Sequence, residues 1–135
     1  MSIRKILAGG AAAAAIVAAT TLLAAPAQAA TSNCPSGAAC IWKDLSWQTN
    51  GIDAAYVGFQ MYIPNYTSWT YSGTVYGAND TATSLYNNGN VSTVTWYRDA
   101  NKGGWGIAWS IKTGDSDLRD NGANDAISSG YFAGY

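Results

Sequence analysis

Short apolar and aromatic runs alternate with turn clusters along most of this 135-residue chain, and no segment after residue 31 shows a sustained helical period. Runs rich in Tyr, Trp, Val, Ile and Thr that are separated by Gly and Asn are typical of β-strands. The pattern therefore predicts an all-β protein, with strands at residues 39–43, 56–63, 70–76, 84–86, 92–98, 106–110 and 127–132.

One hexapeptide occurs twice in nearly the same form. Residues 79–84 (Asn-Asp-Thr-Ala-Thr-Ser) are matched 45 positions later by residues 124–129 (Asn-Asp-Ala-Ile-Ser-Ser), and each copy is followed by one residue and then a tyrosine, Tyr86 or Tyr131. A spaced self-match of this kind indicates a duplicated supersecondary unit.

The two units also begin alike, with an aromatic residue, a cation and an aspartate at 42–44 and again at 97–99. The distance from this opening to the hexapeptide is 37 residues in the first unit and 27 in the second, so the first carries about ten extra residues. We expect them between residues 54 and 77. Duplicated β units predict a sandwich of two Greek keys, spanning about 38–90 and 91–135.

Residues 1–30 have the organisation of a secretory signal peptide. Arg4 and Lys5 precede an apolar run over residues 6–25, and Ala27-Gln28-Ala29 is a small-x-small cleavage site. A membrane anchor is the weaker alternative, because the run is mostly alanine and ends in Pro26 and the cleavage signal. We therefore expect a secreted, extracellular protein whose mature part, residues 31–135, is one domain.

The charged residues exclude several classes of function. Residues 31–135 hold five Lys or Arg and eight Asp, a net charge of −3, which argues against a nucleic-acid partner. The mature chain has no polybasic segment that would hold it on an anionic membrane. The whole chain lacks histidine and glutamate, so it builds neither a Ser-His-Asp triad nor a His-ligated zinc site. We expect a protein that is not an enzyme, is monomeric and uses no organic cofactor.

Cys34 and Cys40 are the two cysteines of the chain. In a secreted protein this short spacing favours a small disulfide loop, worth about 2–2.5 kcal/mol in the chain-entropy model. A free catalytic thiol is the alternative.

The doubled Asn-Asp-x-x-Ser/Thr-Ser segment, with its aromatic-x-Asp opening and following glycines, resembles the βγ-crystallin Greek-key motif in both halves. Residues 34–44, from Cys34-Pro35 through Cys40 to Asp44, are similar to the start of peptidase inhibitor family I36. This is a group of small secreted proteins with a βγ-crystallin-like fold, represented by a metalloproteinase inhibitor. That inhibitor braces its reactive loop with a second disulfide, whereas this chain has no cysteine after Cys40. No reactive bond is therefore carried over.

The resemblance also implies two weak calcium sites. In βγ-crystallin domains that bind calcium, the second and fifth residues of the motif supply side-chain oxygens and the third a backbone carbonyl. The implied ligands are Asp80, Thr83 and the Thr81 carbonyl, then Asp125, Ser128 and the Ala126 carbonyl. With one carboxylate per copy, we expect dissociation constants on the order of 10⁻⁵ to 10⁻³ M.

The alternative is that these side chains serve the turns alone, because Asn, Asp, Ser and Thr all bond nearby backbone. On either interpretation we expect Ser84 and Ser129 to pin a folded hairpin. A second acidic cluster, residues 115–120, lacks the glycine and terminal glutamate of an EF-hand loop, so we expect a solvated loop there.

Six Trp and nine Tyr are many for a chain of this size. We expect a core built on the large rings Trp42, Trp96, Tyr97, Tyr86 and Tyr131. The remaining rings suggest a partner surface in the extra stretch, at Tyr62, Tyr66 and Trp69, since Tyr and Trp are common anchors in protein recognition. An additional hairpin packed on the sheet is the alternative.

Three functions follow. The first is an inhibitor that blocks secreted proteases, plausibly metalloproteases, with a rigid loop and needs no catalytic residues. The second is a calcium-binding structural or stress module without inhibitory activity. The third is a killer toxin-like antimicrobial or cell-wall-binding protein.

Overall fold

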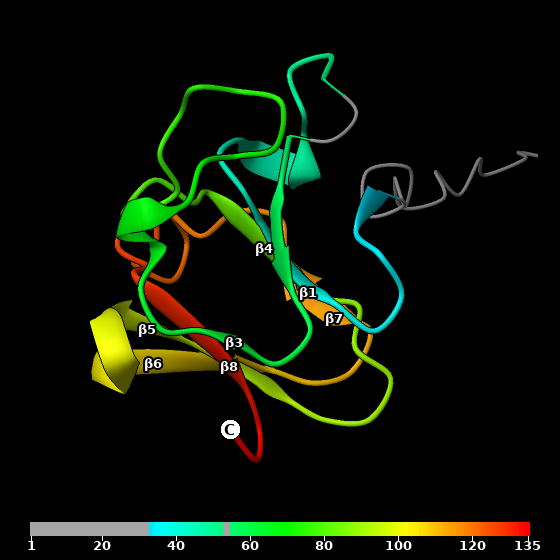
Figure 1. Ribbon diagram of the computed structural model, residues 1–135, viewed down its shortest axis with the longest axis vertical. Helices are drawn as coiled ribbons and strands as arrows, with labels where there is room; N and C mark the ends of the chain where they lie inside the picture. The colour runs from blue at the N-terminus through cyan, green and yellow to red at the C-terminus, as the bar shows by residue number, and fades with distance from the viewer. Residues whose placement is uncertain (1–32, 53–54) are drawn as a thin grey trace, which may run out of the picture.

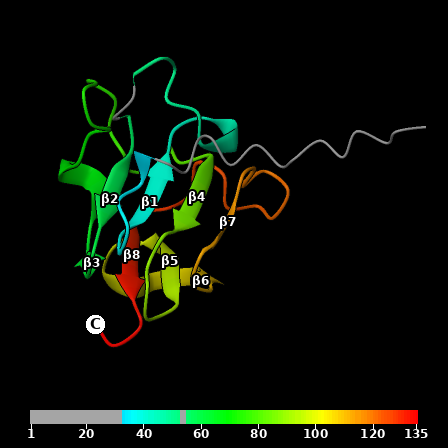
Figure 2. The ribbon, with the colours of Figure 1, turned by 90° about the vertical axis from the view of Figure 1, so that its right-hand side faces the viewer.

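Two four-stranded sheets pack face to face in the computed structural model, which describes residues 33–52 and 55–135 (Figures 1 and 2). The first sheet has the strand order β2-β1-β4-β7 and the second β3-β8-β5-β6. The strands are β1 (Ala39–Trp42), β2 (Val57–Phe59), β3 (Tyr62–Ile63), β4 (Ser84–Asn87), β5 (Val94–Asp99), β6 (Gly103–Trp109), β7 (Thr113–Asp115) and β8 (Ser129–Phe132).

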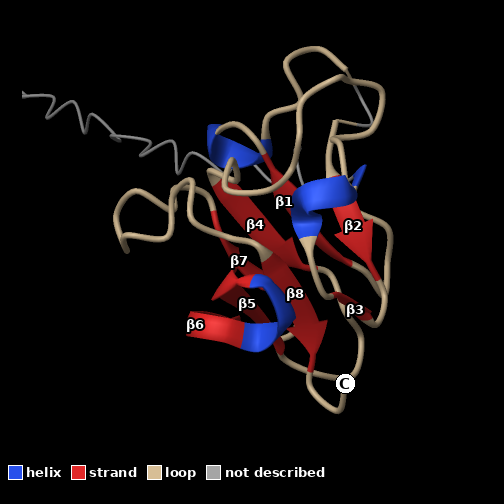
Figure 3. Cartoon of the chain, turned by 60° about the vertical axis from the view of Figure 1, so that its left-hand side comes forward, coloured by secondary structure: helices blue, strands red, loops and turns tan. Residues whose placement is uncertain are grey.

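The helical segments within the described residues are single 3-10 turns, drawn in blue in Figure 3: η2 (Leu45–Trp47), η3 (Tyr66–Ser68) and η4 (Ala100–Lys102). Among these residues no helix has the length and apolarity needed to cross a membrane. The predicted signal peptide, residues 1–30, lies outside the described part of the chain.

Each half of the sequence contributes one strand to the sheet of the other half. Strand β3 precedes residue 91 but pairs with β8, through Tyr62 and Tyr131. Strand β7 follows residue 91 but pairs with β4, through Leu85 and Asp115. This reciprocal exchange ties the two halves into one sandwich, and it confirms the predicted all-β fold of two Greek keys.

Two strand predictions need correction, and one strand was missed. The run at 56–63 is broken at Gln60 and Met61, so that β2 and β3 enter different sheets. The run at 70–76 forms no strand beyond a single bridge from Thr70 to Gly77, because a tight turn at Gly73 (φ +73°) interrupts it. Strand β7 was not predicted, since its sequence Thr-Gly-Asp carries no apolar signal.

The ten extra residues of the first half are divided between two places. Ala39 pairs with Phe59, 20 residues further on, whereas the corresponding Val94 pairs with Trp109, 15 residues on. Half of the insertion therefore precedes β2, partly outside the predicted interval of 54–77, and the other half follows it. The two insertions touch, since the Ser72 N–H donates to the Tyr56 carbonyl at 3.1 Å.

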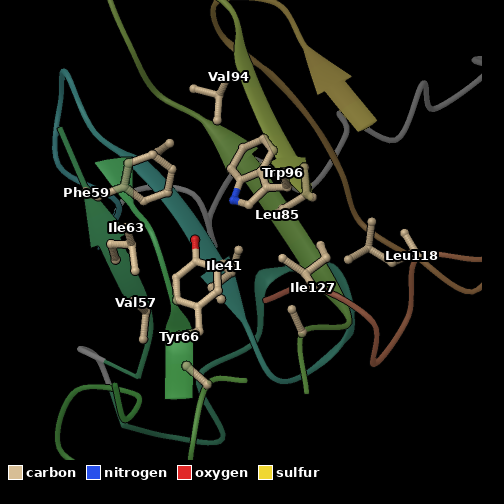
Figure 4. Packing of buried hydrophobic residues seen from close by; sticks show 14 of the residues in the cluster. Ile41, Val57, Phe59, Ile63, Tyr66, Leu85, Val94, Trp96, Leu118 and Ile127 are labelled. Atoms are coloured by element: carbon tan, nitrogen blue, oxygen red, sulfur yellow. The ribbon is translucent and has the colours of Figure 1, made fainter. Parts of the chain in front are cut away.

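The main core fills the space between the sheets (Figure 4). Of the five rings predicted for it, Trp96 is fully buried there and Trp42 is fully buried in a second cluster. Tyr86, Tyr97 and Tyr131 are only half-buried, which corrects the prediction for these three. The partial exposure of Tyr86 follows from its phenol group, because the hydroxyl reaches the surface and donates to the Lys112 carbonyl at 2.9 Å.

The second cluster covers the outer face of the first sheet. Cys34 and Cys40 form the predicted disulfide, with the two sulfurs 2.03 Å apart, and pack with Ala38 and Trp42. Strand β1 is consequently buried on both faces, so the small disulfide loop belongs to the packed body of the protein.

The acidic segment 115–120 is largely the predicted solvated loop. Asp117 accepts from the Arg119 side chain at 2.7 and 2.8 Å, and this pair lies on the surface. The guanidinium beside Asp117 lowers the pKa of that carboxyl below its ordinary value. Two residues depart from the prediction, because Asp115 ends β7 and Leu118 is buried in the core.

Candidate functional site

The two copies of the hexapeptide lie against each other, related by approximate two-fold symmetry. The Asp80 N–H donates to the Ile127 carbonyl at 3.0 Å, and the Asp125 N–H donates to the Ala82 carbonyl at 3.1 Å. Both aspartates have left-handed backbone, with φ of +53° and +51°, a conformation that Asn and Asp adopt more readily than most residues. The repeated Asp is therefore suited to this corner of the fold whatever its side chain binds.

The side chains of the first corner meet a residue of the second. Ser128 Oγ donates to Asp80 Oδ1 at 2.9 Å, across 48 positions of sequence. The second oxygen of each aspartate accepts from the preceding asparagine, Asn79 or Asn124, at 2.7 Å. A hollow of about 270 Å³ lies beside them, bordered by Asp80, Arg98, Asp99, Asp125, Ala126 and Ser128.

Four of the six predicted ligand residues, Asp80, Asp125, Ala126 and Ser128, thus border one hollow. The other two, Thr81 and Thr83, belong to the same corner. The Thr83 N–H donates to the Trp42 carbonyl at 2.9 Å, and the Thr81 hydroxyl donates to the Gly77 carbonyl at 2.7 Å. The Thr81 hydroxyl is therefore already bonded within the protein. The group that the prediction names as a calcium ligand is the Thr81 backbone carbonyl.

The Thr81 hydroxyl also lies against a buried tyrosine. Tyr71 is buried and its hydroxyl lies 3.2 Å from Thr81 Oγ1. Burial raises the pKa of the Tyr71 phenol, with smaller contributions in the same direction from the carboxylates of Asp125 and Asp44.

The last serine of each copy pins a hairpin, as the sequence predicts. Ser84 Oγ donates to the Asp44 carbonyl and Ser129 Oγ to the Asp99 carbonyl, both at 2.7 Å. Each hydroxyl also accepts a backbone N–H, from Trp47 at 3.1 Å or from Lys102 at 3.4 Å. Both serines are fully buried.

The predicted partner residues do not form one surface. Tyr62 and Trp69 are 47% and 44% exposed. Tyr66 is fully buried in the main core, so it makes no direct contact with a partner. Tyr66 was predicted to lie on the surface because it belongs to the extra stretch and other rings were assigned to the core, whereas η3 turns its ring inward. Tyr62 stacks on Tyr131 with ring centroids 5.5 Å apart.

Asn87 is a functional candidate that the sequence analysis missed. It is fully buried at the end of β4, and its side-chain amide makes three hydrogen bonds to the backbone. In the sequence it is one of three asparagines at 87–90, a cluster that predicts a turn but does not indicate which amide is buried.

The sheet exchange and the paired corners define a βγ-crystallin-like domain, and solved structures agree. A structure described as "Evolution of the eye lens beta-gamma-crystallin domain fold" matches with a TM-score of 0.59 and 22% identity, over 76% of this chain and 91% of that one. Spherulin 3a from Physarum polycephalum matches with a TM-score of 0.52 and 22% identity, over 76% and 87%. A βγ-crystallin from Ciona intestinalis matches with a TM-score of 0.53 and 15% identity, over 71% and 99%.

The family assignment comes from the sequence. Residues 27–109 match the model of peptidase inhibitor family I36, and the chain belongs to that family. A search of curated proteins found no match.

Proposed function

We propose that this protein is secreted and inhibits an extracellular protease of the metalloprotease class by blocking its cleft with a rigid loop. Membership of a peptidase inhibitor family is the observation that carries the proposal. An inhibitor of this kind needs a fixed shape and no catalytic group of its own.

The architecture supports that requirement. Reciprocal strand exchange, two serine-pinned hairpins and a disulfide loop packed on β1 hold the connecting loops in place before any partner arrives. A loop that is already ordered does not lose conformational entropy on binding, so more of the contact energy appears as affinity.

The test is a titration of proteases with the mature protein, residues 31–135. Residual activity of thermolysin, a zinc endopeptidase, and of subtilisin, a serine endopeptidase, is measured against increasing protein. Stoichiometric loss of thermolysin activity is the expected result. Full activity of both proteases at micromolar protein contradicts the proposal.

The paired corners favour calcium binding as a second candidate function. Hard cations such as calcium take oxygen ligands, and the hollow beside Asp80 is bordered by three aspartates, by Ser128 and by the Ala126 backbone, together with one cationic residue, Arg98. Within residues 33–52 and 55–135, no three His, Cys, Asp or Glu side chains converge to hold a metal. A calcium ion here therefore needs hydroxyl and carbonyl oxygens beside the carboxylates, which is the donor set proposed above.

In this role Asp80, Thr83 and the Thr81 carbonyl would hold one ion, and Asp125, Ser128 and the Ala126 carbonyl would hold the other. The hydrogen bond from Ser128 Oγ to Asp80 Oδ1 already links the two sets of ligands, so ions held there would add to the contacts between the halves. Binding to the folded state alone adds about 2.7 kcal/mol per site when calcium is a hundred times its dissociation constant.

The measurement is the thermal midpoint with 10 mM calcium and with a chelator, for the wild type and for Asp80→Ala. The wild-type midpoint should rise with calcium and the variant should show a smaller rise. Asp117→Ala is the matched control, because Asp117 is a partly exposed aspartate that pairs with Arg119 and does not border the hollow. An unchanged wild-type midpoint ends the calcium proposal without affecting the inhibitor proposal.

A further inference from the structure

The connection between β4 and β5 carries a highly exposed aliphatic side chain, and its backbone is fixed by hydrogen bonds from several parts of the protein. Val91, in the middle of this loop, is 86% exposed, and the neighbouring Asn90 is exposed as well. Asn87, at the start of the loop, is fully buried. The loop therefore presents an apolar group to solvent from a fixed base.

A single buried side chain holds both ends of this loop. Asn87 Oδ1 accepts the Gly89 N–H at 2.8 Å, and Asn87 Nδ2 donates to the Ser92 carbonyl at 3.1 Å. The same amide nitrogen donates to the Trp109 carbonyl at 2.9 Å, which fixes Asn87 to β6. The spacing of residues 89 and 92 is thus set from inside the protein.

The disulfide loop supports the same segment from behind. Asn88 Nδ2 donates to the Cys34 carbonyl at 2.7 Å, and the Gly37 N–H donates to the Asn88 carbonyl at 2.9 Å. Asn90 Nδ2 donates to Ser36 Oγ at 3.3 Å, and Ser36 Oγ lies 3.4 Å from Asn90 Oδ1, to which it donates. The Cys34–Cys40 disulfide therefore braces a loop that lies more than 40 residues away in the sequence.

Lys112 completes the support from the opposite side. Its Nζ donates to the carbonyl and to the side-chain Oδ1 of Asn88, at 2.8 and 2.7 Å. Asn88 is consequently bonded on both sides, whereas Asn90 and Val91 have no backbone hydrogen bond within the described residues. Their N–H and C=O groups are free to pair with another chain.

The other strongly exposed valine lies in a different setting. Val75 is 91% exposed, but the turn that contains it is closed by backbone hydrogen bonds between neighbouring residues of the same turn. The Thr74 N–H donates to the Tyr71 carbonyl, and the Tyr76 carbonyl accepts from the Tyr71 N–H, both at 3.0 Å. Val75 therefore lies in a turn closed by backbone hydrogen bonds, whereas Val91 lies in an open bend over residues 90–92 whose shape is held by the Asn87 side chain.

We propose that residues 89–92 are the segment that enters the cleft of the inhibited protease, with the Val91 side chain in its specificity pocket. This inference rests on the proposed function and adds the contact segment to it. Asn87, Lys112 and the Cys34–Cys40 loop act as positioning groups that keep the segment in one shape.

The chemistry of the segment selects the class of partner. Residues 88–92 carry no charged side chain, and Val91 is a branched aliphatic group. The partner is therefore an endopeptidase with an apolar specificity pocket. A protease whose specificity pocket carries a carboxylate to bind Lys or Arg finds no cationic side chain in residues 88–92, so we expect no inhibition of that class.

The experiment compares Val91→Asp with Val75→Asp as inhibitors of thermolysin, which accepts aliphatic side chains, and includes trypsin as the protease with a charged pocket. Both valines are exposed, so both variants should keep the wild-type melting temperature within about 3 °C. Loss of a central anchor residue weakens binding about 30-fold or more.

The expected result is that Val91→Asp raises the inhibition constant for thermolysin about 30-fold, Val75→Asp leaves it unchanged, and trypsin is not inhibited. Wild-type inhibition that Val91→Asp leaves intact overturns the loop assignment, and so does an equal loss in Val75→Asp. Inhibition of trypsin by the wild type overturns it as well. A wild type that inhibits no protease overturns the proposed function together with the loop.

Discussion

Ser84 and Ser129 offer a direct test of the internal duplication. Each hydroxyl occupies the same place in its half, where it accepts a backbone N–H and donates to a backbone carbonyl of the opening hairpin. Replacing either serine by alanine removes one oxygen and leaves the buried surroundings otherwise unchanged. If the halves are structurally equivalent, the two substitutions should have similar effects.

The expected cost can be worked out from the bonds that are lost. A typical protein hydrogen bond contributes about 1 kcal/mol net, and a buried group left without a partner adds a desolvation cost. With two bonds lost at a buried site, each substitution should lower the free energy of unfolding by about 2–3 kcal/mol. Ser129 accepts the Lys102 N–H at 3.4 Å, against 3.1 Å for Trp47 and Ser84, so its effect should lie at the lower end.

Urea unfolding followed by tryptophan fluorescence measures both values, and the thermal midpoint should fall by about 10 °C. Ser110→Ala is the control, because Ser110 is exposed and only its backbone carbonyl is used as an acceptor. It should change stability by less than about 0.5 kcal/mol. A Ser84→Ala variant as stable as the control, or a large difference between the two buried serines, would refute the reasoning.

Three further predictions concern other parts of the fold. Replacing Cys34 and Cys40 together by serine should lower stability by about 2–2.5 kcal/mol without loss of the sheet signal in circular dichroism; an equally stable variant argues against a bracing role. Burial raises the pKa of the Tyr71 and Tyr66 phenols, so the folded protein keeps both neutral where the unfolded chain ionises them. Stability should be unaffected by these groups below about pH 10 and should fall above it by about 1.4 kcal/mol per pH unit for each phenol. Tyr71→Phe should roughly halve that slope in urea titrations between pH 9 and 11, and an unaltered slope would show that Tyr71 ionises freely. Asn87→Ala removes three hydrogen bonds at the base of the 89–92 loop, so thermolysin should cut the variant within that loop much faster than the wild type. Mass spectrometry locates the cut, and cleavage elsewhere first would contradict the positioning role.

The periodicity of apolar residues and the repeat were enough to predict the fold class. Alternation of aromatic runs with glycine and asparagine turns indicates strands, and a hexapeptide repeated at 45 residues indicates two equivalent units. The roles of Ser84 and Ser129 were also predictable, because a short hydroxyl side chain in a turn bonds nearby backbone. The disulfide followed from the short spacing of the two cysteines.

Local sequence patterns did not predict the assignment of strands to sheets. The break at Gln60 and Met61 and the pairing of the polar strand β7 both arise from the exchange between halves, which depends on contacts far apart in sequence. The burial of Tyr66 has the same origin, since a ring beside polar neighbours turns inward only where two sheets leave space for it.

The candidate sites divide in the same way. The match between the two copies of the motif depends only on local sequence, so it is enough to show which residues are equivalent. It therefore predicted that Asp80 and Asp125 occupy corresponding turns. The meeting of Asp80 with Ser128, and the support that Asn87, Lys112 and the disulfide loop together provide for Val91, required the folded chain. Ser128 lies 48 residues from Asp80, and Cys34 and Lys112 lie 54 and 24 residues from Asn88, so only the packing of the two sheets brings these groups within hydrogen-bonding distance.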